Sequence, residues 1–152
     1  GHQAISLTLL RDRRYVENAR AWCDDIIARS IVQVQRRMGL AAGDFDIEMR
    51  LVGQDATLGA LETGRVVPHE IGVLAIVTAP EEKQAVEIAK ILNPHLLHHA
   101  LSADEPMPTF AFPFSPAEIS RGALYEFNLH HVMALDDPMA AFRLVVDEVG
   151  YG

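Results

Sequence analysis

The chain has 152 residues, of which 49% are hydrophobic and 22% charged, and its formal net charge is -8. One domain accounts for this length, and the composition excludes a disordered polypeptide. Because a negative chain repels phosphate groups, neither nucleic acid nor a membrane is an expected partner.

Cys23 is the single cysteine, which excludes an internal disulfide and a cysteine metal cage. No apolar run approaches the roughly 20 residues that cross a bilayer, and no basic-then-apolar leader opens the chain. We therefore expect a soluble protein of the reducing cytoplasm.

The first half of the chain predicts a strand, a long helix and a second strand. Residues 4–10 alternate, with Ile5, Leu7 and Leu9 on one face and Ser6 and Thr8 on the other. Residues 13–38 carry apolar side chains at steps of three and four, which predicts one continuous helix after an Asp12 cap and before Gly39. Residues 45–51 alternate as a strand with one solvent-exposed face, and residues 53–68 are expected to form a loop or a long hairpin connection.

The second half predicts two further strands and two helices. Residues 70–78 are apolar on both parities, which indicates a central strand buried on both faces. A helix is expected from Pro80, kinked or ended by Pro94, and then an ordered but irregular proline-rich crossing over residues 101–120. Residues 123–133 predict the last strand, and a last helix is expected from Pro138, with its apolar side at Phe142, Val145, Val146 and Val149.

This order is βαββαβ, so we predict a single α+β domain over residues 1–152 with a ferredoxin-like sandwich and an extra C-terminal helix. The first and third strands would be central and the other two would be edges. Leu74 and Ile76 then require a cover over the sheet face that the helices leave free. The candidates are the proline-rich crossing, the last helix or another chain. Because the first two are short, we expect a homodimer.

Polar residues flank the loop between the second and third strands. Gln54 and Asp55 follow one strand, while His69 and Glu70 precede the next, so both pairs are expected at one end of the sheet. Asp55, His69, Glu70 and His131 are the candidate catalytic residues, because a histidine and carboxylates that converge can transfer protons. They can equally be turn formers, and we favour that interpretation.

No cofactor or metal is expected. His95 and His99 are four residues apart and would share a helical face, but no acidic residue at fixed spacing completes a metal site. The glycines at 53, 59 and 64 match no nucleotide-binding fingerprint. Phe110 to Pro116 places three aromatic rings in a proline-rich stretch, for which we favour a cover over the free sheet face rather than a ligand lining.

Several short motifs follow one another in a characteristic order along most of the chain, from the first strand to Phe142. They are Gly53-Gln54-Asp55, Gly59-Ala60-Leu61-Glu62, His69-Glu70-Ile71-Gly72, Phe112-Pro113-Phe114-Ser115-Pro116, Tyr125-Glu126-Phe127, His131-Val132 and Asp136-Asp137-Pro138. Their order and spacing resemble the C-terminal part of the bacterial acyclic terpene utilisation AtuA-like family, formerly a domain of unknown function.

The resemblance implies a C-terminal portion or split subunit of a longer protein, because members carry a large N-terminal α/β portion. It also implies a link to the catabolism of branched acyclic terpenoids and related acyl compounds. The first hypothesis is an accessory, interaction-forming domain, whose partner is a second copy or the N-terminal catalytic portion. The alternative is an enzyme domain that contributes acid–base residues to chemistry on a small acyl substrate.

Overall fold

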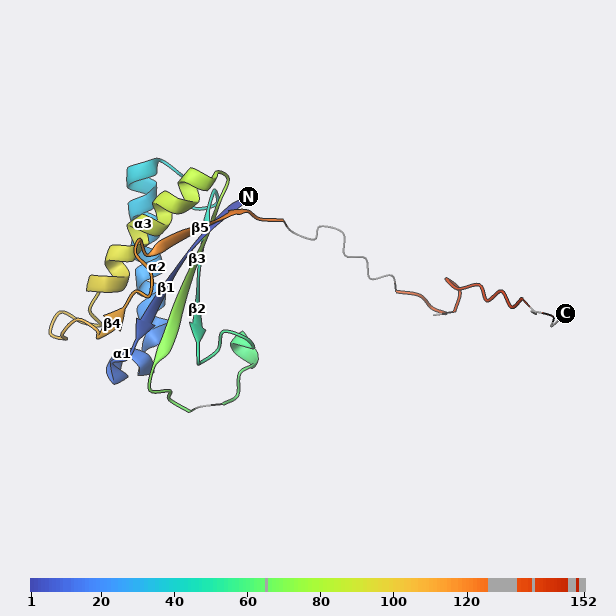
Figure 1. Ribbon diagram of the computed structural model, residues 1–152, viewed down its shortest axis with the longest axis horizontal. Coiled ribbons are helices and arrows are strands. Elements are labelled where there is room, and N and C mark those ends of the chain that lie inside the picture. Colours follow the sequence, from blue (N-terminus) through green and yellow to red (C-terminus); the bar gives the residue numbers. More distant parts are fainter. Residues whose placement is uncertain (65, 126–133, 138, 148–149, 151–152) are drawn as a thin grey trace.

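A computed structural model describes residues 1–64, 66–125, 134–137, 139–147 and 150. These residues form an α+β fold in which helices pack against an antiparallel sheet (Figure 1). The elements are β1 (His2–Leu10), α1 (Arg13–Glu17), α2 (Ala19–Met38), β2 (Asp46–Val52), the 3-10 turn η1 (Gly59–Leu61), β3 (Ile71–Ala79), α3 (Glu82–His98), β4 (Phe110–Ala111) and β5 (Glu118–Ala123).

The sheet has the order β2-β3-β1, and both β4 and β5 pair with the other edge of β1. β1 and β3 are therefore internal, as the sequence predicts, and β2 is an edge strand. In the register, Ile5 lies opposite both Ile76 of β3 and Ile119 of β5, while Leu7 lies opposite Leu74. All these pairs are antiparallel, so paired side chains share one face.

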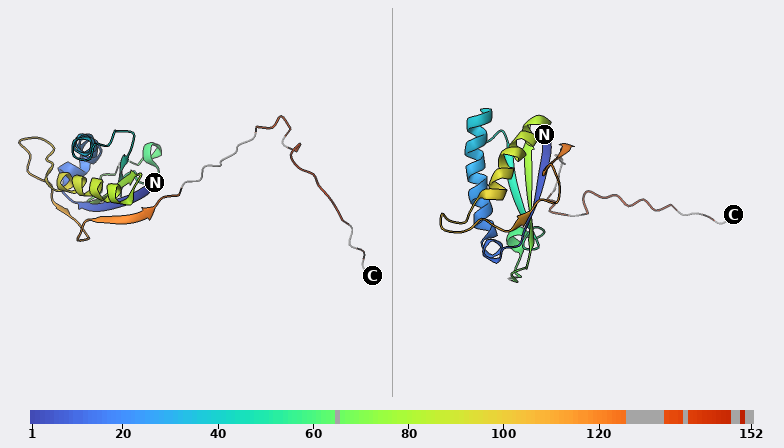
Figure 2. Two further views of the ribbon diagram at one scale, coloured as in Figure 1. Left: turned by 90° about the horizontal axis from the view of Figure 1, so that it is seen from above. Right: turned by 60° about the vertical axis from the view of Figure 1, so that its left-hand side comes forward.

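The helices lie on one side of this sheet (Figure 2). The predicted single helix over residues 13–38 is in fact two helices, which is a correction. Asp12 caps α1 by accepting a hydrogen bond from the Arg14 N–H at 3.1 Å. The backbone leaves helical geometry at Asn18, with φ -112 and ψ 15, and α2 then runs to Gly39, whose φ of 69 ends it. Tyr15 of α1 and Trp22 of α2 are both buried in the core.

The third helix, α3, begins with a capping box in which Glu81 and Gln84 each accept from the other's backbone N–H. It does not end at Pro94, although proline removes one helical hydrogen bond. The buried stripe continues past this residue to Leu96, and burial of that side chain offsets the lost bond.

The two faces of the sheet differ in burial. Ser6 and Thr8 point toward the helices and are buried, so the side of β1 that carries these polar residues faces the core. On β3 the helix-facing parity is buried, but the opposite parity is only half-buried, which corrects the prediction of burial on both faces. We call this second surface the open face. Its apolar side chains are Ile5, Leu7, Leu9, Leu74, Ile76 and Ile119.

The proline-rich crossing is more regular than the sequence predicts, because it contains strand segments. β4 and β5 both lie within or beside it, because the free edge of β1 offers unpaired backbone groups that these segments satisfy. Phe112 packs against the helix-side core, and β4 extends the sheet in its own plane, so the segment is not the expected cover. Most of the predicted last strand, residues 126–133, lies outside the described residues.

The expected C-terminal helix is also corrected. Residues 139–141 form a turn, and residues 142–147 have no helical structure. Phe142 is 73% exposed and Leu144 is 87% exposed, so neither side chain has packed. A short amphipathic helix is marginal in water without tertiary contacts, which explains why the periodic pattern alone does not produce one here.

Candidate functional site

β1 and β2 end, and β3 begins, at the same end of the sheet (Figure 1), and several of the polar candidate residues lie in the segments next to it. The antiparallel register brings this about, because Leu10 at the end of β1 lies opposite Ile71 at the start of β3. Residues that follow β1 and β2 therefore meet those that precede β3. Three of the four predicted site residues, Asp55, His69 and Glu70, lie at this end.

Asp55 is held beside the helices and away from β3. The Leu51 carbonyl accepts hydrogen bonds from the N–H groups of residues 54, 55 and 56 at 3.0, 3.1 and 3.2 Å, which turns the chain sharply after β2. The Asp55 carboxylate then accepts from the Arg20 guanidinium at 2.9 Å, and Arg20 also donates to the Met49 carbonyl at 2.9 Å. Asp55 and Arg20 line a depression of about 650 Å³ along the edge of β2. The carboxylate is thus an ion-pair acceptor.

His69 and Glu70 are exposed on the last residues before β3. The His69 side chain lines a separate depression of about 290 Å³ with Arg11, Arg13, Val67 and Pro68. The structure therefore does not bring Asp55 and His69 into one pocket, and Glu70 lines neither depression. His131 lies outside the described residues.

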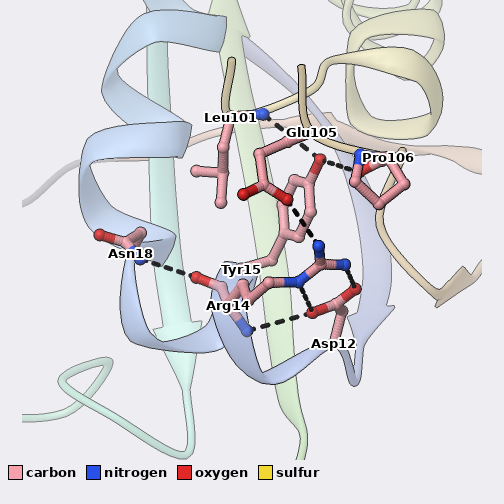
Figure 3. Close-up of polar contacts among 7 residues, drawn as sticks. All are labelled: Asp12, Arg14, Tyr15, Asn18, Leu101, Glu105 and Pro106. Carbon is pink, nitrogen blue, oxygen red and sulfur yellow. Dashed lines mark hydrogen bonds and ion pairs between the residues drawn. The ribbon is translucent and has the colours of Figure 1, made fainter. Parts of the chain in front are cut away.

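A second polar cluster fastens the loop after α3 to α1 (Figure 3). The Arg14 guanidinium pairs with Asp12 at 2.6 Å and with Glu105 at 2.5 Å. The hydrogen bond from Arg14 holds the pKa of Asp12 below its usual value. The Tyr15 hydroxyl donates to the Pro106 carbonyl at 2.7 Å and lies 3.3 Å from the Leu101 N–H, which donates to it. These contacts hold the loop of residues 101–106 in place against α1, and we call this loop the wall.

A depression of about 490 Å³ lies beside this wall and contains an Asp–His pair. The His99 Nε2 lies 2.7 Å from Asp25, and the His99 side chain is only 15% exposed. Asp25 also accepts from Arg29, whose hydrogen bond is the main cause of the lowered pKa of Asp25. Trp22 donates its indole N–H to the His99 carbonyl at 2.7 Å. Contacts from Trp22 and Arg29 thus hold the Asp25–His99 pair in place. The sequence analysis did not predict this pair.

His95 and His99 therefore have different environments, although they are four residues apart. Burial lowers the pKa of His95, and the neighbouring His99 contributes in the same direction. The His99 ring is already paired with Asp25. Across the described residues, no group of three histidine, cysteine or acidic side chains is arranged to hold a metal ion.

The sequence holds no local signal for the contacts that were missed. Arg14 and Glu105 are 91 residues apart, and Trp22 and His99 are 77 residues apart. An arginine near a helix start normally indicates only a solvated face. Only the fold brings these groups together.

Comparison with protein-family models, with curated proteins and with solved structures finds no match to this chain in any of the three. None of the helices in the described ranges combines the length and apolar character needed to span a bilayer.

Proposed function

We propose that this chain is an accessory, interaction-forming domain of an AtuA-like protein, linked to the catabolism of branched acyclic terpenoids or related acyl compounds in the cytoplasm. Its fold in this proposal is ferredoxin-like, with β5 in the place of the fourth strand. The strand order β2-β3-β1-β5 and the two helix crossings on one face support that assignment. The ordered motifs from Gly53 to Asp137 support the family.

The observation that carries an interaction role is the open face. Its centre is a continuous apolar band, because Ile5 lies between Ile76 and Ile119 and Leu7 lies opposite Leu74. No helix or loop among the described residues packs over it (Figure 2). Soluble monomers seldom leave a band of this kind in water, so a partner surface belongs there.

The partner in this proposal is a second copy of the chain. Four strands, β2, β3, β1 and β5, lie side by side. At about 4.8 Å per strand and about 30 Å in length, their face measures roughly 600 Å². Each partner in a standard protein interface buries about 800 Å², so the open face alone supplies most of the area that such an interface requires. At the edge of the band, Glu48 and Arg50 supply both signs of charge for a polar rim.

The experiment is sedimentation or light scattering of the chain over a concentration series. We expect a dimer, and we expect Leu74→Glu to raise its dissociation constant at least about tenfold, because a carboxylate would lose its water in the interface. Arg50 lies opposite Leu74 in the register and can pair with the new carboxylate, so the monomer should still fold.

Val32→Glu is the matched control. Val32 is an apolar residue on α2 that is 63% exposed and lies on the helix side of the sheet, so its variant should dimerise normally. A chain that stays monomeric at high micromolar concentration would contradict the proposal and assign the open face to another partner, such as an N-terminal catalytic portion. Equal weakening by both variants would also contradict it.

A further inference from the structure

We propose that the depression lined by Arg11, Arg13, Val67, Pro68 and His69 binds a small organic carboxylate. We call it the arginine pocket. It lies at the end of the sheet, whereas the proposed dimer contact lies on the open face, so the two proposals stand independently. The residues that line it come from two segments more than fifty positions apart in the chain.

The sheet register brings these two segments together. Arg11 directly follows Leu10, which pairs with Ile71, and His69 comes two residues before Ile71. Arg11 is fixed further by its backbone N–H, which donates to the Thr109 carbonyl at 3.1 Å. Arg13 stands in the first turn of α1, whose start Asp12 caps. The pocket is therefore built on the ends of regular elements.

The charge of the pocket runs against that of the chain. The protein has a formal net charge of -8, yet the ionisable residues that line this depression in the described part of the chain are two arginines and a histidine. Among the described residues, no carboxylate lies within ion-pair distance of Arg11. Arg13 pairs with Glu17 at 2.8 Å, but an exposed pair of this kind is weak and can be exchanged for another anion.

The donors present suit a carboxylate. A guanidinium offers two parallel N–H groups that match both oxygens of a carboxylate, and a neutral imidazole still has one N–H to donate. Arg11 and His69 are both exposed at the pocket, so their donors are accessible to a ligand from solvent. Glu70 follows His69, but its side chain does not line the pocket.

Size and wall chemistry narrow the ligand further. The volume of about 290 Å³ is near the lower end of the range for ligand pockets, which admits only a small molecule. Val67, which is 45% exposed, and Pro68 form an apolar wall beside the cations. An acid with a short hydrocarbon portion uses both surfaces, whereas inorganic phosphate uses only the cations.

The test is a backbone-amide NMR titration of the full chain at constant ionic strength with sodium hexanoate, hexanamide and sodium phosphate. We expect saturable shifts with hexanoate at residues 11–13 and 67–70, weaker binding of phosphate and none of hexanamide. Hexanamide binding as tightly as hexanoate would overturn the role of the arginines. Phosphate binding as tightly would overturn the preference for an organic acid, and shifts spread over many arginines would overturn the site.

Variants give the sharper result. Arg11→Gln should weaken hexanoate binding about tenfold, which corresponds to about 1.4 kcal/mol. Arg36→Gln is the matched control, because Arg36 is exposed in the last turn of α2, and its variant should bind normally. Glu17→Gln should tighten binding, since it releases Arg13. Unchanged binding in Arg11→Gln, or weaker binding in Glu17→Gln, would overturn the proposal.

Discussion

Two buried serines show how differently the same side chain can be accommodated in this core. The Ser6 hydroxyl donates to the Asn93 side-chain oxygen at 2.8 Å, and the Asn93 amide donates to Glu118 at 2.9 Å. These contacts tie β1, α3 and β5 together. The Ser30 hydroxyl, equally buried on α2, has no hydrogen-bond partner among the described residues. The two positions should therefore respond in opposite ways to the same substitution.

We predict that Ser6→Ala lowers the free energy of unfolding by about 1–3 kcal/mol, because it leaves the buried Asn93 oxygen without a donor. Ser30→Ala should leave the free energy of unfolding unchanged or raise it, since it removes a buried hydroxyl that has no bond to lose. Urea denaturation monitored by Trp22 fluorescence measures both values. Equal losses in the two variants would show that volume, and not hydrogen bonding, decides the effect.

At the scale of single elements, the end of α2 depends on one backbone conformation. Gly39 has a φ of 69, and no atom outside its immediate neighbours lies within 4 Å of the position that a Cβ would take. Any loss of stability from adding a side chain there therefore comes from the left-handed backbone conformation and not from a steric clash with another residue. Gly43 also has open space around it, but its φ is not in the left-handed region.

We predict that Gly39→Ala lowers the free energy of unfolding by about 1–2 kcal/mol, the usual cost of left-handed backbone for an L-residue. Gly43→Ala is the control and should be neutral or slightly stabilising, because it reduces the freedom of the unfolded chain. Thermal or urea unfolding of the two variants provides the comparison. A loss at Gly43 as large as that at Gly39 would contradict this account of the helix end.

Elements defined by local patterns were the ones that the sequence predicted well. The alternation from Phe45 to Leu51, the Asp12 cap and the Gly39 stop each depend on residues close together in the chain, and all three are confirmed. The break at Asn18 was missed because the apolar repeat continues across it. β5 was missed because it forms by pairing with the edge of β1, which is far away in the sequence. No pattern within residues 118–123 indicates that this pairing occurs.

The same reasoning applies to the candidate sites. The register places His69 at the predicted end of the sheet, since it depends only on strand pairing. Whether Asp55 and His69 face one pocket depends on the Arg20 contact, which comes from a helix more than thirty residues away. Arg11 and Arg13 belong to none of the motifs found in the sequence, and their position beside His69 is visible only in the fold.

At the scale of the whole molecule, stability should decrease from the centre of the sheet outward. β3 is paired with β1 along its whole length and with β2 from Gly72 to Thr78, and its helix-facing side chains are buried. β2 pairs with no strand other than β3 in the part of the chain that the structure describes, and residues 142–147 include large apolar side chains that are exposed to water. Because an amide exchanges only when its hydrogen bond opens, the protection of each amide against hydrogen exchange measures this decrease in stability directly.

We predict that the amides of Val73 to Val77 exchange with solvent deuterium only through global unfolding. The amides of residues 142–147 should exchange at nearly the unprotected rate, because neither a helix nor burial shields them. Hydrogen exchange followed by NMR at several denaturant concentrations separates local from global opening. Loop-like exchange at Val73 to Val77 would contradict the central position of β3. Helical protection over residues 142–147 that rises with protein concentration would show that the expected last helix forms against a second copy of the chain.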